Sequence, residues 1–155
     1  MAMTAALMMS GSVAQAQDVN IGRSNITLTS DLMTPETLWA MGRIGAAQAS
    51  PDGKKIVYQV GYYSVKENKG HQVLRVMDAD GKNDRLLTTS AKSEGDAAWL
   101  DNNTLAFLTG GQLWTMNVDG TNRKQLTHSD IDIEGFRFSP DRKRVVLIKS
   151  IPYYG

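Results

Sequence analysis

Residues 95–127 decide the fold, and they read GDAAWLDNNTLAFLTGGQLWTMNVDGTNRKQLT. Three apolar runs of strand length lie within this stretch, at residues 97–100, 104–109 and 112–118. Clusters of Asp, Asn and Gly separate the runs, and these residues tolerate the positive φ angles that tight turns require. The stretch therefore predicts one short antiparallel sheet of about four strands.

Parts of this unit recur on both sides of it. The sequences MDADG at 77–81 and LT at 87–88 match MNVDG at 116–120 and LT at 126–127, at a constant spacing of 39 residues. Likewise, ASPDGKKIVY at 49–58 matches FSPDRKRVVL at 138–147. A period of about 40 residues that carries strands and turns is typical of β-propeller blades.

We therefore predict an all-β fold, a partial β-propeller of about two and a half blades of four-stranded antiparallel sheet. The predicted units span residues 49–90, 95–129 and 133–155, and the third is truncated. Each blade covers one face of its neighbour, so an incomplete ring would leave Trp99, Phe107, Trp114 and Phe138 partly exposed at an open end. The missing blades, from a longer polypeptide or from another chain, are predicted partners.

Residues 17–48 precede the units as an N-terminal extension with one short helix at 35–42. Thr34 is placed as the helix N-cap, Pro35 as its first residue and Glu36 in its first turn. Residues 18–31 alternate weakly, which fits either an edge strand or a surface segment. Within the units we expect strands at 55–60, 71–78, 84–89 and 144–150, and a polar loop at 62–70.

Composition limits the classes of function. The net charge is +1 with basic residues spread through the turns, which argues against nucleic acid as a partner. The chain has no cysteine, which excludes disulfides, thiolate chemistry and cysteine-based zinc sites. No segment reaches the roughly 20 apolar residues of a membrane span.

Residues 1–16 carry no charged side chain and end in Ala14-Gln15-Ala16, the A-x-A form that signal peptidases accept. We interpret them as a signal peptide, which predicts a secreted or periplasmic protein. The alternative is a disordered cytosolic tail.

The repeated S-P-D-x-K/R turn, followed by M-D/N-x-D-G and L-T, resembles the propeller repeats of the TolB family and of prolyl oligopeptidase family serine peptidases. Residues 32–45, which run into Ser50-Pro51-Asp52-Gly53, are similar to the N-terminal entry of secreted bacterial dipeptidyl-peptidase and acylaminoacyl-peptidase members. The resemblance covers about residues 29–149. It is more specific for fold than for activity.

The resemblance implies a propeller that covers the active site of an α/β-hydrolase domain and admits short peptides. The nucleophile of that domain lies in a G-x-S-x-G elbow, which this chain does not contain. No catalytic residue and no cofactor is therefore predicted here, and the partners are a peptide substrate and the hydrolase domain. Two alternatives stay open, a TolB-like periplasmic propeller that binds proteins without catalysis, and a truncated product without function.

Among individual side chains, Glu134 is the candidate substrate-binding residue. Asp130, Asp132 and Glu134 are spaced two apart, so in a strand they would share one face, where they could capture the amino terminus of a peptide or a metal. The alternative is a solvated loop between blades. His71 and His128 are expected to be surface or hydrogen-bonded histidines rather than metal ligands.

Trp99 and Trp114 are expected to pack between blades, although stacking on a ligand is the alternative. Residues 78–89 begin like a calcium loop. They carry Lys82, Asn83 and Thr89 where such a loop needs a ligand, a glycine and a glutamate, so they are read as turn residues.

Overall fold

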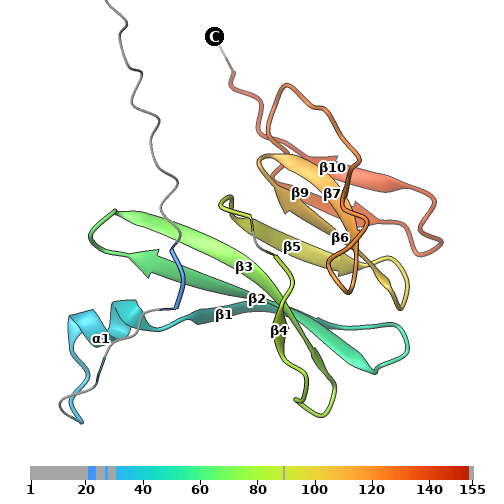
Figure 1. Cartoon of the computed structure of the whole chain (residues 1–155). Coiled ribbons are helices and arrows are strands. Elements are labelled where there is room, and N and C mark those ends of the chain that lie inside the picture. The colour runs from blue at the N-terminus through green and yellow to red at the C-terminus, as the bar shows by residue number, and fades with distance from the viewer. Residues whose placement is uncertain (1–20, 24–26, 28–30, 89, 154–155) are drawn as a thin grey trace, which may run out of the picture.

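The computed structural model describes residues 21–23, 27, 31–88 and 90–153. The predicted signal peptide and most of residues 18–31 lie outside the described residues. The described chain forms three antiparallel sheets in succession (Figure 1). The elements are α1 (Pro35–Ala40), β1 (Arg43–Ala49), β2 (Lys55–Ser64), β3 (Lys69–Asp78), β4 (Arg85–Leu86), β5 (Glu94–Trp99), β6 (Thr104–Thr109), β7 (Gln112–Asn117), β8 (Lys124–Gln125), β9 (Gly135–Phe138) and β10 (Val145–Ile148).

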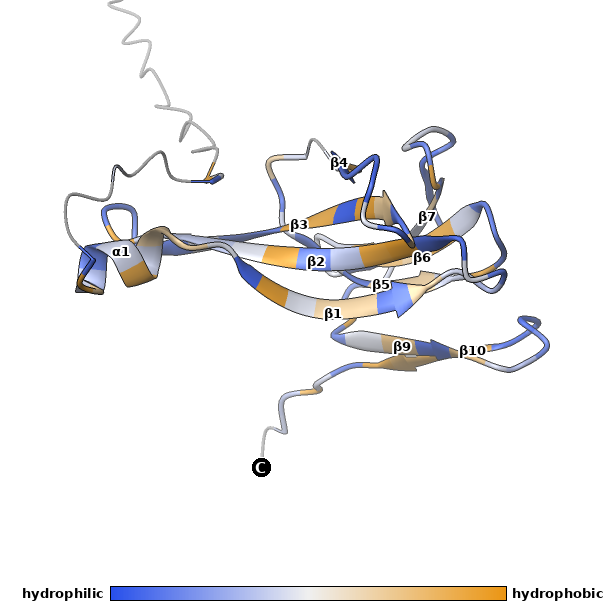
Figure 2. Ribbon diagram, turned by 90° about the horizontal axis from the view of Figure 1, so that it is seen from below, coloured by the Kyte–Doolittle hydropathy of each residue, from blue (hydrophilic) through white to orange (hydrophobic). Residues whose placement is uncertain are grey.

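The first sheet contains β1 to β4 and the second β5 to β8, each in sequence order, while the third contains β9 and β10. Two complete four-stranded sheets and one two-stranded sheet confirm the predicted all-β, partial propeller-like fold. Hydrophobic segments lie along the strands and hydrophilic residues at the turns (Figure 2). None of the helical structure in the described part of the chain has the length and apolarity that a membrane span needs.

The repeated motifs form the same turns in each copy. The amide of Ser50 donates to the carbonyl of Lys55 at 2.8 Å, and the amide of Ser139 donates to that of Arg144 at 2.9 Å. In both turns the serine hydroxyl donates to the following Asp, at 2.7 Å to Asp52 and 2.5 Å to Asp141. The sequence repeat therefore encodes a side-chain hydrogen-bond network that closes the turn between β1 and β2 and the turn between β9 and β10.

The Leu-Thr repeat also has one role in both complete sheets. The hydroxyl of Thr88 accepts from the amide of Leu74 at 3.3 Å, and that of Thr127 accepts from the amide of Leu113 at 2.9 Å. In each sheet the threonine hydroxyl accepts the hydrogen bond that a backbone carbonyl of a longer outer strand would otherwise accept. This is why the outer strands β4 and β8 are two residues long, shorter than the predicted strand at 84–89.

The first and second sheets enclose the main core. Trp99 is 3% exposed and lies in a cluster with Val57, Leu74 and Phe107. Its indole nitrogen donates to the carbonyl of Gln48 in β1 at 3.1 Å. Trp99 therefore packs between sheets, as predicted.

A second cluster joins the second and third sheets through Leu113, Ile133 and Phe136. Phe138 packs against it, edge to face with Phe136 at 5.7 Å between ring centroids. The predicted exposure of Trp99 and Phe107 was wrong, because both sheets that cover them are present in this chain. Exposed apolar side chains lie instead on β1 and β10, with Ile44 72% and Val146 67% exposed, and in the segments before β1 and after β10.

Strand β1 was not predicted. It begins at Arg43, inside the segment expected to be an extension, and pairs antiparallel with β2. The helix therefore ends at Ala40 rather than at residue 42, since Met41 is already extended. The ring of Trp39 contacts that of Tyr63 at a tilt of 40°, with 4.9 Å between centroids, which anchors α1 against the end of β2.

The predicted loop at 62–70 was also wrong, because β2 and β3 run on to Ser64 and Lys69. Asn68, at a φ of 47°, closes the short turn between them. Strand β10 is shorter than the predicted 144–150.

Candidate functional site

The predicted residue Glu134 lies just before β9 and is exposed. Its carboxylate accepts from the hydroxyl of Ser150 at 2.7 Å, and its amide donates to the carbonyl of Ile148 at 2.9 Å. It lines an open cavity of about 350 Å³ at the end of the sheets where β5 begins. Gln59 and Gln72 of the first sheet and Asp96 of the second line the same cavity, so Glu134 meets all three sheets there.

A bulge in β5 shapes the wall of this cavity. The strand register shifts between Gly95 and Ala98, and Asp96 has a φ of 50°. The amide of Asp96 donates to the side-chain oxygen of Gln59 at 3.2 Å. A Cβ on Gly95 would lie 2.8 Å from that oxygen and 3.0 Å from the side-chain oxygen of Gln72, so a larger residue would displace the ends of both glutamine side chains.

The predicted acidic face of Asp130, Asp132 and Glu134 is not a strand face, because β9 begins only at Gly135. Residues 130–134 lie against the turn between β6 and β7, where the amide of Ile133 donates to the carbonyl of Gly111 at 2.9 Å. A Cβ on Gly111 would lie only 2.0 Å from Asp132 Oδ1. Asp132 therefore packs on the turn rather than beside Glu134.

The two histidines differ. His71 is 7% exposed, and its ring nitrogens lie 2.8 Å from the carbonyl oxygen of Ile21 and 3.2 Å from that of Ser90. It is a hydrogen-bonded histidine of the interior, as expected. His128 is exposed.

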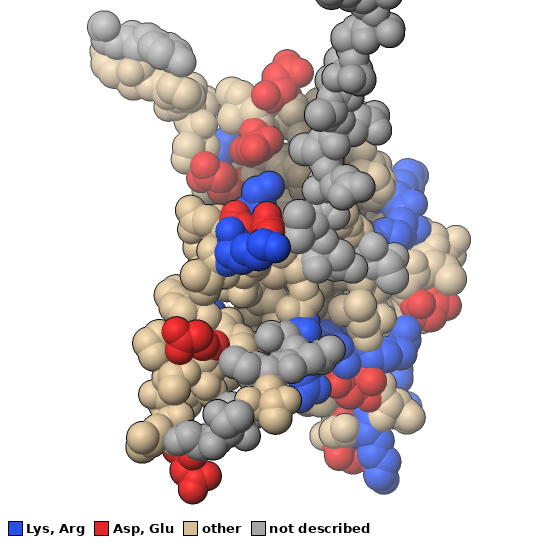
Figure 3. Space-filling model, turned by 60° about the vertical axis from the view of Figure 1, so that its left-hand side comes forward, with Lys and Arg blue, Asp and Glu red and all other residues tan. Residues whose placement is uncertain are grey.

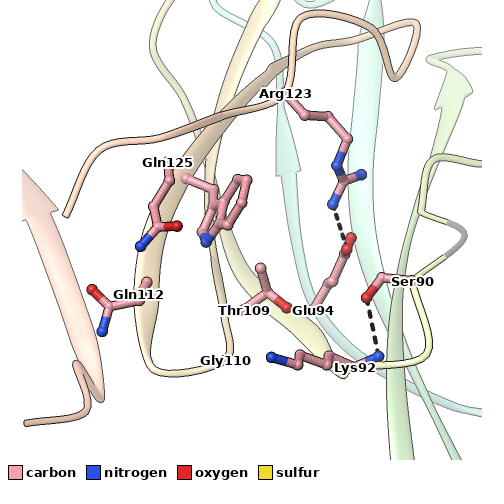
Figure 4. Close-up of a pocket in the computed structure, with 9 residues that line it drawn as sticks. Ser90, Lys92, Glu94, Thr109, Gly110, Gln112, Arg123 and Gln125 are labelled. Atoms are coloured by element: carbon pink, nitrogen blue, oxygen red, sulfur yellow. Dashed lines mark hydrogen bonds and ion pairs between the residues drawn. The ribbon is translucent and has the colours of Figure 1, made fainter. Parts of the chain in front are cut away.

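A second cavity, of about 510 Å³, lies on the second sheet, beside the segment that joins it to the first (Figure 4). We call it the junction pocket, and it is lined by Ser90, Lys92, Glu94, Thr109, Gly110, Gln112, Trp114, Arg123 and Gln125. Register pairing places Glu94 opposite Thr109 and Thr109 opposite Gln112, so these three side chains share one face of the second sheet. Trp114 is half-buried and packs against the main core, which confirms its expected place between the sheets.

Glu94 is the buried charge of the junction pocket, with 1% of its surface exposed. It forms an ion pair with Arg123, whose guanidinium lies over the ring of Phe107 at 4.9 Å. Burial raises the pKa of the Glu94 carboxyl above its ordinary value, while the charge of Arg123 opposes that change. Within the described residues, Glu94 Oε2 and Thr109 Oγ1 are buried without a hydrogen-bond partner.

Sequence reasoning missed this pair. Glu94 and Arg123 are 29 residues apart and meet only because β5 and the segment before β8 flank the same sheet face. The available signal was weak, a glutamate at the start of a strand that also carries Asp96. Elsewhere, acidic and basic side chains lie beside one another on the surface (Figure 3). Arg75 and Asp84 form an ion pair at 2.8 Å.

Two curated relatives match most of the chain. It is 34% identical over 130 residues to dipeptidyl-peptidase 5 of Porphyromonas endodontalis and 39% identical over 132 residues to dipeptidyl-peptidase 5 of Porphyromonas gingivalis, matches that cover 81% and 82% of this chain. The chain is related to peptidases of the prolyl oligopeptidase family. It spans 19% of the length of each of these two relatives. No family model matches it.

Solved structures share the fold at low identity. The acylaminoacyl peptidase of Pyrococcus horikoshii superposes with a TM-score of 0.58 at 12% identity, covering 72% of this chain and 18% of that one. The isopeptidase AtxE2 gives a TM-score of 0.58 at 18% identity, over 74% of this chain and 23% of that one. An oligogalacturonate lyase in complex with manganese gives 0.56 at 18% identity, over 71% and 35%. At such identities the likeness concerns the fold alone.

Proposed function

We propose that this chain is the N-terminal propeller part of an exported serine-type dipeptidyl-peptidase. The observation that carries the proposal is the 34% and 39% identity to two dipeptidyl-peptidases, which runs through most of the chain. The A-x-A sequence at Ala14-Gln15-Ala16 supports export. These matches favour a peptidase over the TolB-like alternative.

In this proposal the sheets restrict access to a hydrolase domain that supplies the nucleophile. The role is steric, since a narrow entrance admits a short or unfolded peptide and rejects a folded protein. The 155 residues contain no G-x-S-x-G elbow, so they contribute gating and binding rather than bond cleavage. Glu134 is the candidate for capturing the ammonium group of the peptide, because its carboxylate is exposed at a cavity where three sheets meet.

The test compares the full-length protein with the 155-residue chain on a dipeptidyl p-nitroanilide. We expect turnover that a serine-directed fluorophosphonate blocks in the full-length protein, and none from the chain alone. Turnover by the chain alone, or none by the full-length protein, would contradict the proposal. A folded protein that carries the same N-terminal dipeptide tests the gate, and we expect it to resist cleavage.

Glu134→Gln in the full-length protein tests the ammonium site. Loss of one charge-assisted hydrogen bond should raise KM about tenfold and leave kcat nearly unchanged. Asp130→Asn is the matched control, since Asp130 is an exposed carboxylate of the same segment. Equal effects of the two substitutions would remove Glu134 from the site.

A further inference from the structure

The junction pocket is lined by residues from two consecutive parts of this chain. Its walls come from β5, β6, β7 and β8 of the second sheet and from the segment that links β4 to β5. Both sheets are complete in this chain, and their interface is closed by a buried core. A cavity of about 510 Å³ is large enough for a small organic molecule.

The pocket presents two buried oxygen atoms that lack a hydrogen-bond partner, a carboxylate oxygen, which accepts, and a hydroxyl, which can accept or donate. Glu94 Oε1 accepts from Arg123, whereas Glu94 Oε2 and Thr109 Oγ1 have no partner among the described residues. Buried polar groups are rarely left unpaired, and an ionised carboxylate binds a charged donor more strongly than a neutral one. The floor therefore fits an ammonium group.

The mouth of the pocket has the opposite charge. Lys92 lies on the linker, where its amide donates to the hydroxyl of Ser90 at 3.0 Å, as Figure 4 shows. Its ammonium group lies at the turn between β6 and β7, only 3.4 Å from where a Cβ on Gly110 would be. Among the described residues Lys92 forms no salt bridge. A ligand carboxylate would supply that partner.

Trp114 adds an apolar wall to this polar pair. It is half-buried, lines the pocket and lies opposite Gln125 in the sheet register. An aliphatic side chain that packs on the indole would gain apolar contact, while Gln112 and Gln125 offer neutral hydrogen-bonding groups at the rim.

We propose that the junction pocket binds a small zwitterion, a free α-amino acid with an aliphatic side chain. Its ammonium group donates to Glu94 Oε2 and Thr109 Oγ1, its carboxylate pairs with Lys92, and its side chain packs on Trp114. The site adjoins the cavity that Glu134 lines, because Thr109 and Gly110 line both, whereas Glu94, Lys92 and Trp114 line the junction pocket alone. Binding there would link amino-acid concentration to the stability of the second sheet and of the segment that precedes it.

The experiment is calorimetric titration of the full-length protein, treated with a fluorophosphonate so that a catalytic serine cannot contribute a second site. L-Leucine should bind at one saturable site with a Kd of about 1 mM or tighter. N-Acetyl-L-leucine lacks the ammonium group and L-leucinamide lacks the carboxylate, so each should bind at least about tenfold more weakly. Absence of saturable leucine binding would overturn the proposal, as would equal affinity for all three compounds.

Three variants assign the contacts. Thr109→Val keeps the shape of the side chain and Glu94→Gln keeps most of its volume, and each should weaken leucine binding about tenfold. Lys92→Ala should weaken leucine binding and leave leucinamide binding unchanged. Lys92 is exposed, so this variant keeps the test valid even if Glu94→Gln fails to fold.

Lys82→Ala is the matched control, since Lys82 is an exposed lysine in a turn that does not line the pocket. Unchanged leucine binding in Glu94→Gln and Lys92→Ala would place the ligand elsewhere and overturn the proposal. So would a crystal structure, solved with saturating leucine, that shows only a water molecule between Glu94 and Thr109.

Discussion

Strands β1 and β5 occupy equivalent positions, because each is the first strand of its four-stranded sheet and lies at an edge of that sheet. Each also contains a bulge. Every residue of β1 is exposed, while β5 carries the buried Trp99 and Glu94. The difference lies in what each strand buries. The side chains of β5 reach into the core between the first two sheets, where Trp99 donates to the Gln48 carbonyl of β1, while the side chains of β1 itself stay exposed in the described chain. Whether the side chains of such an edge strand are buried therefore depends on the neighbouring sheet and not on the position of the strand in its own sheet.

Among the tests of this comparison, Trp99→Ala in the full-length protein should change the free energy of unfolding most. Removing a buried indole from between two sheets should lower the free energy of unfolding by about 3–5 kcal/mol. Urea denaturation at constant m-value measures it. Unchanged stability would mean that the interface between the sheets does not depend on this side chain.

Ile44→Ala is the matched change on β1. Ile44 is 72% exposed in this chain, so the substitution should alter the free energy of unfolding by less than about 0.5 kcal/mol. A loss of about 2 kcal/mol in the full-length protein would show that a further sheet covers β1 there, which would sharpen the comparison.

A smaller effect should appear in the pH dependence of stability. Burial raises the pKa of Glu94, so the folded state holds its proton more tightly than the unfolded chain does. The contribution of Glu94 therefore falls as the pH rises from the ordinary glutamate value, about 4.3, through the raised value in the folded state. Glu94→Gln should flatten the stability curve in that window.

Asp78 is the contrasting carboxyl on the surface. Hydrogen bonds from Lys55 and Asn83 lower its pKa, so its contribution is present above the ordinary aspartate value and is lost as the pH falls below it. Asp78→Asn should therefore lower stability at neutral pH and have little effect at acid pH, where the carboxyl is protonated in both states. Urea unfolding at about pH 2 to 8 distinguishes the two variants, and identical curves would contradict the assignment.

The smallest expected changes in the free energy of unfolding concern the two Ser-Pro-Asp turns. Gly53 has a φ of 70° and its counterpart Arg142 a φ of 58°, both in the left-handed region. Gly53→Ala should lower the free energy of unfolding by about 1 kcal/mol, because a side chain is strained there. Arg142→Gly relieves a similar strain but adds chain entropy to the unfolded state, so its net effect should lie within about 0.5 kcal/mol. Thermal unfolding of both variants checks the contrast.

The parts of the fold that sequence predicted depend on local chemistry. The Ser-Pro-Asp turns and the Met-Asp/Asn-x-Asp-Gly turns close through hydrogen bonds between residues at most five apart, such as that from the Lys55 amide to the Ser50 hydroxyl. The helix start at Thr34 is equally local, since its hydroxyl accepts from the Thr37 amide at 3.2 Å. A single chain segment carries all the information for such features.

The parts that sequence missed depend on distant partners. Strand β1 is rich in Ala and Gly, which favour strands weakly, and it is extended because β2 pairs with it. The ion pair of Glu94 and Arg123 likewise needs the bulge at Gly95 and the return of the chain before β8. The role of Glu134 stays a prediction, although the structure does bring it to a cavity at the meeting of three sheets.

The short outer strands have a consequence for self-association. An edge strand exposes unpaired amides and carbonyls that can template pairing with another molecule, and the risk grows with its length. In both complete sheets the outer strand is two residues long, and a threonine hydroxyl occupies the next amide of the strand inside it. The repeated Leu-Thr pair therefore reduces the number of unpaired backbone groups at this edge of each sheet, which disfavours edge-to-edge aggregation.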